Sequence, residues 1–99
     1  MVLNVNAATV GASAATEGGV AAELAAATAA ASAALTAVMP MGADLDSIQF
    51  AAALNAAGAS YIGAAGEHAA NRGAFAGSQN LAAATYTVTD AINNTALAL

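Results

Sequence analysis

The chain has 99 residues, enough for one domain, and its six acidic residues stand against a single cation, Arg72, for a net charge of −5. Nucleic acids and anionic membrane surfaces are therefore poor ligands, because proteins bind both through clustered lysine and arginine. The absence of cysteine from the sequence excludes disulfides and thiolate metal sites.

A first helix is predicted over residues 8–38. Alanine, which accounts for 35 of the 99 residues, has the highest helix propensity and is depleted in strands. The larger apolar residues of this segment recur at helical spacing, at Val20, Leu24, Leu35 and Val38. The Gly18-Gly19 pair weakens the helix locally and permits a kink or a frayed first segment. A turn over residues 39–45 follows, because Pro40 disfavours helical geometry in the residue before it and Gly42 permits a chain reversal.

A second helix is predicted over residues 46–85, followed by a frayed tail. Asp44 and Ser47 are capping residues, which satisfy the free backbone N–H groups of a first turn. Two apolar stripes follow at helical spacing, and the antiparallel first helix can cover only one of them. The first stripe is Phe50, Leu54, Ala57, Tyr61, Ala64, His68 and Phe75, and the second is Ile48, Ala52, Ala59 and Ile62.

Five glycines lie within this second helix, and each costs a helix about 1 kcal/mol relative to alanine. They are Gly58, Gly63, Gly66, Gly73 and Gly77. Their presence inside an apolar pattern indicates close approach of another helix, and a locally unwound helix is the alternative.

Only 24 apolar residues are larger than alanine, too few to bury a stable core on several faces. We therefore expect an all-α, antiparallel two-helix hairpin that completes its core against a partner protein. Contacts with that partner are expected to centre on Leu24, Leu35, Val38, Ile48, Phe50, Leu54, Tyr61, Ile62 and Phe75.

The sequence offers no convincing catalytic or metal site, so we expect a non-enzymatic protein without a cofactor or small-molecule substrate. Glu67 and His68 are adjacent, and on a helix their side chains point about 100° apart, so they do not converge on one ion. Arg72 supports a weak local ion pair or a contact to an acidic partner. Tyr86 and Asp90 have an i,i+4 spacing, which places a ring and a carboxylate on one helical face. That pair is a recognition element for another protein or, alternatively, a tyrosine that closes the apolar stripe beside a solvated aspartate.

Several residues together form a family pattern. They are Val20 and Leu24 in the alanine-rich first helix, the run Leu35-Thr36-Ala37-Val38-Met39-Pro40, the turn Gly42-Ala43-Asp44 with Ser47 beyond it, Phe50-Ala51-Ala52, and Tyr86 four residues before Asp90. With them, the chain resembles the PE family of mycobacterial proteins, substrates of ESX-type type VII secretion, over nearly its whole length. The last pair matches the YxxxD/E secretion motif of that family. The Pro-Glu dipeptide that names the family is absent, and Ala7-Ala8 stands in its place.

The resemblance implies two antiparallel helices that pair with the helices of a PPE protein into a four-helix bundle, as an obligate heterodimer. It also implies that a cytosolic secretion chaperone binds the PPE partner rather than this chain directly. Tyr86 and Asp90 would form the secretion signal, together with a Trp-x-Gly turn of the partner at the same end of the bundle. The pair would form in the cytoplasm and leave through the type VII machinery for the cell surface or the medium. Residues 1–10 lack the charged and apolar regions of a classical signal peptide.

Two other interpretations remain. Residues 24–43 and 47–66 are both free of charged side chains and are about as long as a membrane span, which favours an alanine-rich, membrane-associated hairpin. These windows contain few Leu, Ile or Phe residues, which speaks against that interpretation. An ice-binding helix is a weaker alternative, because the threonines show no regular 11-residue repeat.

Overall fold

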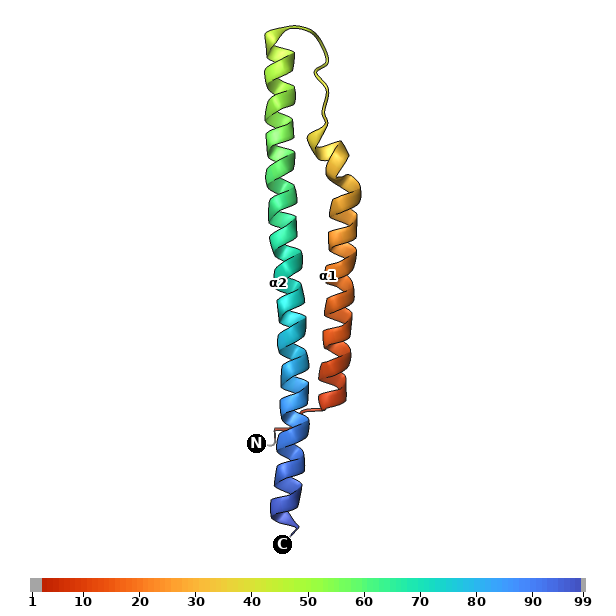
Figure 1. The fold of residues 1–99 in the computed structure, drawn as a ribbon, viewed down its shortest axis with the longest axis vertical. Helices are drawn as coiled ribbons and strands as arrows, with labels where there is room; N and C mark the ends of the chain where they lie inside the picture. Colours follow the sequence, from red (N-terminus) through yellow and green to blue (C-terminus); the bar gives the residue numbers. More distant parts are fainter. Residues whose placement is uncertain (1–2, 99) are drawn as a thin grey trace. The chain divides into compact units, whose positions relative to one another are not determined.

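A computed structural model describes residues 3–98 of the chain, which form two α-helices joined by a short connection (Figure 1). Helix α1 spans Ala7–Thr36 and helix α2 spans Leu45–Leu97. The described residues include no strand, so the all-helical class is confirmed. The four-helix bundle with a partner stays a prediction.

The described residues group into two compact units, each of which pairs a segment of α1 with a segment of α2. Unit 1 consists of the described parts of Met1–Ala21 and Asn71–Leu99, and unit 2 consists of Ala22–Ala70. Within each unit the two helical segments run side by side in opposite directions (Figure 1). Unit 2, which contains the connection between the helices, is therefore a hairpin in its own right.

Local chemistry sets both ends of α1. At its start, the backbone N–H of Thr9 donates to the side-chain oxygen of Asn6 over 3.0 Å, so Asn6 caps the helix. The Gly18-Gly19 pair does not interrupt α1, which is continuous to Thr36. Pro40 lies four residues beyond Thr36, and a proline ring at that spacing in a helix would collide with the Thr36 carbonyl. The helix therefore ends before the proline.

Asp44 caps the start of α2. Its two carboxylate oxygens accept the backbone N–H of Ser47 at 3.0 Å and the Ser47 hydroxyl at 2.8 Å. These bonds, first from the Ser47 backbone and then from its hydroxyl, lower the pKa of Asp44 below its usual value of 3.8. The capping role predicted for Asp44 and Ser47 is thus present in the structure.

Helix α2 extends further than the sequence suggested. We expected a frayed tail after residue 85, but the helix continues to Leu97. No glycine or proline follows Gly77 to stop the helix, which continues although residues 86–97 are rich in threonine and asparagine, both weak helix formers. The hydroxyls of Thr85, Thr87 and Thr95 each donate to the carbonyl four residues earlier. These side chains therefore find hydrogen-bond partners in the helical conformation itself.

Small side chains form the contact between the helices. Among the described residues, the buried ones are Ala14, Ala51, Gly58 and Ala76. A Cβ atom built on Gly58 would fall on the Leu35 carbonyl oxygen and 2.6 Å from its carbonyl carbon, so the two backbones approach closely there. The expectation of close approach at glycines therefore holds at this one position in α2.

The remaining glycines of α2 correct that expectation. A Cβ added at Gly63, Gly66, Gly73 or Gly77 would meet no atom within 4 Å. Helix α1 also leaves the bulky members of both predicted stripes mostly exposed, and only Ile62 is partly buried. The physical reason is that α1 packs along a line of small residues that lies between the two stripes. Helix α1 therefore covers neither of the two predicted stripes.

Two polar contacts join the helices within unit 1. Arg72 Nε donates to Glu17 Oε2 over 3.1 Å, and Gln79 Nε2 donates to the Ser13 hydroxyl over 3.0 Å. The ion pair expected near Arg72 is therefore made across the helices, not with a neighbour on α2. Because both of its partners are partly exposed, it contributes at most about 1 kcal/mol, and its main effect is to fix the register of the two segments.

The membrane alternative can be compared with these helices. By length and composition, α1 is the one described helix that could cross a bilayer. The first window proposed for a membrane span, residues 24–43, is interrupted where α1 ends at Thr36.

Candidate functional site

The bulky side chains at the start of α2 are exposed on one face. Phe50, Leu54 and Tyr61 are four and seven residues apart, so they lie on the same side of the helix. Their exposed fractions are 63%, 41% and 60%. Large apolar side chains gathered on one helical face in this way are typical of a surface that another protein covers.

The end of α1 extends this surface. Leu35 and Val38 are partly buried, and together with Leu54 and Tyr61 they line a groove of about 340 Å³ in unit 2. We call Leu35, Val38, Phe50, Leu54 and Tyr61 the apolar face. All five were predicted as contact residues, and the structure brings them together in one unit.

Asn55 holds Val38 in place on the apolar face. The Val38 N–H donates to Asn55 Oδ1 at 2.8 Å, and Asn55 Nδ2 donates to the Val38 carbonyl at 3.1 Å. Val38 lies beyond the last residue of α1, so its backbone groups need partners outside that helix. A single side chain satisfies both.

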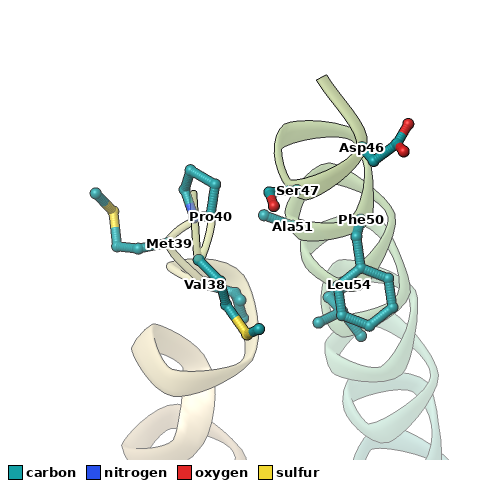
Figure 2. A pocket seen from close by; sticks show the side chains of 9 residues that line it. Val38, Met39, Pro40, Asp46, Ser47, Phe50, Ala51 and Leu54 are labelled. Atoms are coloured by element: carbon teal, nitrogen blue, oxygen red, sulfur yellow. The ribbon is translucent and has the colours of Figure 1, made fainter. Parts of the chain in front are cut away.

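A cleft opens beside the apolar face, between the connection and α2 (Figure 2). Val38, Met39 and Pro40 stand on the side of the connection, and Ser47, Ala51 and Leu54 on the side of α2. The cleft has a volume of about 280 Å³, and Phe50 and Met41 also line it. Sequence reasoning assigned the methionines to a turn and missed them as surface. The structure identifies them as surface residues, since Met41 is 94% exposed.

The other predicted contact residues do not all join the apolar face. Leu24 and Ile62 are partly buried, and Ile48 is about half exposed. Ile48 is two residues before Phe50, about 200° away around the helix, so it lies on a different side of α2. Phe75 belongs to unit 1, where its ring is exposed. Partner contact at these four residues stays a prediction.

Tyr86 and Asp90 belong to a second surface, in unit 1. They lie about one turn apart on α2, and both are exposed. With Thr89 and two residues that precede α1, Leu3 and Val5, they line a cleft of about 220 Å³. We call this the motif cleft. No local pattern indicated that the N-terminal segment would lie beside Tyr86, because the two segments are more than 80 residues apart.

Glu67 and His68 are both exposed on α2. Within residues 3–98, no set of three or more histidine, aspartate and glutamate side chains is placed to hold a metal ion. The apolar face carries no charged side chain, and the motif cleft carries one, Asp90. Their chemistry suits contact with another protein.

The comparisons with known proteins agree with the resemblance seen in the sequence. The model of one family, described as the PE family, matches residues 3–93. The match includes the apolar face, the connection, and both Tyr86 and Asp90. No curated protein and no solved structure in the comparisons matches the chain.

Proposed function

The chain belongs to the PE family, and from this premise we propose that it is the PE subunit of a PE–PPE heterodimer exported by an ESX type VII secretion system. Like other members of this non-enzymatic family, it would act through contacts with proteins. The observation that carries the proposal is the apolar face, which is left exposed because α1 packs on alanine and glycine instead.

The energetics of the apolar face support an obligate partner. Fully burying a large apolar side chain contributes about 1.5–3 kcal/mol, so covering Phe50, Leu54 and Tyr61 contributes several kcal/mol. The alanines between α1 and α2 bury much less apolar area per residue. Contact of the apolar face with a partner would therefore stabilise the chain more through apolar burial than the contact between α1 and α2 does.

A PPE-type partner fits this surface, since two further helices laid on the apolar face would complete a four-helix bundle. Met39 and Met41 would extend the contact at the connection. Methionine side chains adapt to irregular neighbours, which suits the edge of such an interface. In this proposal the secretion chaperone binds the partner and does not contact this chain.

Tyr86 and Asp90 are proposed as the secretion signal of the heterodimer. Both side chains are exposed about one helical turn apart and lie within the residues that match the family. The proposal also places a Trp-x-Gly turn of the partner at the same end of the bundle. Export would then depend on side chains from both proteins.

Co-expression with a PPE protein of the same organism tests the proposal. We expect the two proteins to copurify and to elute as one heterodimer. Tyr61→Asp, which places a charge on the apolar face, should abolish copurification. Leu81→Asp is the matched control, because Leu81 is also a mostly exposed apolar residue of α2 but belongs to unit 1, outside the apolar face. Copurification of the Tyr61→Asp variant at the wild-type level would contradict the proposal.

A membrane-associated hairpin is the second candidate, favoured by the length and composition of α1. Cell fractionation separates the two. In the heterodimer proposal, the co-expressed protein stays in the supernatant after ultracentrifugation without detergent. Recovery in the membrane pellet, released only by detergent, would favour the second candidate.

A further inference from the structure

The motif cleft has the size and walls of a site for one side chain. Its volume of about 220 Å³ is below the roughly 300 Å³ at which small-molecule pockets begin. Leu3 and Val5 supply apolar walls, Tyr86 supplies an aromatic ring, and Asp90 supplies a carboxylate. An occupant that satisfies all of these groups has an apolar stem and a polar end.

The N-terminal segment is a built part of this cleft. Asn6 caps α1 through its bond to the Thr9 N–H, which fixes where the chain enters the helix. Val5, just before that cap, is partly buried although it belongs to no helix. Leu3 and Val5 therefore line the cleft as a consequence of how α1 begins.

The negative charge of Asp90 and of the chain as a whole favours an occupant whose polar end is positively charged. The chain has one cationic side chain, Arg72, and it is engaged by Glu17 at 3.1 Å. That ion pair is the one salt bridge among the described residues, so Asp90 has no side-chain cation there. Among the described residues no side-chain cation faces Asp90, and the net charge of −5 favours the approach of a positive group from another molecule.

We infer that the motif cleft binds one arginine side chain of the protein that reads the export signal, and that Leu3 and Val5 are part of that signal. This inference rests on the export role proposed for Tyr86 and Asp90. The arginine stem packs against Leu3 and Val5. Its guanidinium lies over the Tyr86 ring and donates paired hydrogen bonds to the Asp90 carboxylate. Lysine fits less well, because its ammonium group cannot make the paired bonds.

The experiment is an NMR titration of the ¹⁵N-labelled full chain, copurified with its partner, with the capped tripeptide Gly-Arg-Gly. We expect weak, saturable shifts confined to residues 3–5 and 86–90. The same tripeptide with citrulline, which is neutral and nearly the same shape, should cause no such shifts. The lysine tripeptide should bind at least about twofold more weakly than the arginine one.

Three variants make the test specific. Asp90→Asn and the double variant Leu3→Ser with Val5→Ser should each weaken arginine binding about two- to fivefold. Glu67→Gln removes the same charge from an exposed site elsewhere on α2 and should leave binding unchanged. Equal binding of arginine and citrulline, or full binding by the Leu3/Val5 double variant, would overturn the inference. Failure to copurify a partner would instead count against the proposed function, and the titration can still be run on the full chain alone.

Discussion

The side-chain amide of Asn55 satisfies both backbone polar groups of Val38, at 2.8 Å and 3.1 Å. This pair of bonds joins two segments 17 residues apart and replaces the helical bonds that Val38 lacks beyond the end of α1. Only one orientation of the amide allows both, so its donor and acceptor are assigned without ambiguity. The position of Val38 on the apolar face depends on this contact.

Asn55→Ala should therefore lower the free energy of unfolding by about 1–3 kcal/mol, because it leaves two partly buried backbone groups without partners. Urea unfolding of the copurified complex measures this. Asn71→Ala is the control, since Asn71 is exposed and makes no described side-chain bond, and its effect should stay within about 0.5 kcal/mol. Equal effects of the two variants would contradict the role given to Asn55.

Gly58→Ala should destabilise the protein although alanine favours helices. The added methyl group would fall on the Leu35 carbonyl, and such overpacking costs about 1–3 kcal/mol, more than the gain of about 1 kcal/mol in helix propensity. At Gly63 the same change meets open space and should stabilise by about 0.5–1 kcal/mol. Opposite signs in thermal unfolding are the expected result. A stabilising Gly58→Ala would show that the helices do not approach closely there.

The isolated full chain should unfold without a sharp transition. Its buried side chains are alanines, and its larger apolar residues remain mostly exposed. Circular dichroism should show helical content with a broad thermal melt, and addition of the partner should make the melt cooperative. A cooperative, well-packed monomer in the absence of other proteins would contradict both this prediction and the proposed need for a partner.

The Asp44 cap predicts a dependence of stability on pH. The pKa of Asp44 is lowered in the folded chain by its bonds from Ser47. Its charged form therefore stabilises the fold fully above the ordinary value of 3.8, and this contribution is lost as the pH falls through the lower, folded pKa. The wild type should exceed Asp44→Asn in stability at neutral pH, and the difference should vanish in strong acid. A difference that grows on acidification would be the wrong sign.

Tyr86→Ala should block export and leave the heterodimer intact, because Tyr86 lies in the motif cleft and outside the apolar face. Immunoblots of culture filtrate and cell lysate measure export, and copurification measures assembly. Thr85→Ala is the matched control, since Thr85 is the preceding residue on a different side of α2. Normal secretion of the Tyr86→Ala protein would remove the tyrosine from the signal.

The sequence predicted those features that depend on neighbouring residues. Pro40 and Asp44 carry local signals, and α1 ends before one and α2 begins after the other. The line of small residues along which the helices pack, the seam, could not be predicted, because its position depends on how each helix is rotated about its axis. For the same reason the pairing of Glu17 with Arg72, 55 residues apart, was missed. Periodicity placed Phe50, Leu54 and Tyr61 on one side of α2, but it could not predict that α1 would leave them exposed.

Because α1 and α2 pack through alanine and glycine, different residues serve the fit between the helices and the recognition of a partner. A larger side chain at Gly58 disturbs the fit of α1 to α2, because the Leu35 backbone leaves no space for it. Exchange of one bulky apolar residue for another at Phe50 or Tyr61, whose side chains are mostly exposed, leaves that fit unchanged. Recognition of a new partner can therefore evolve by such exchanges without cost to the hairpin that carries them. A scaffold of this kind suits the diversification of pairs within a family.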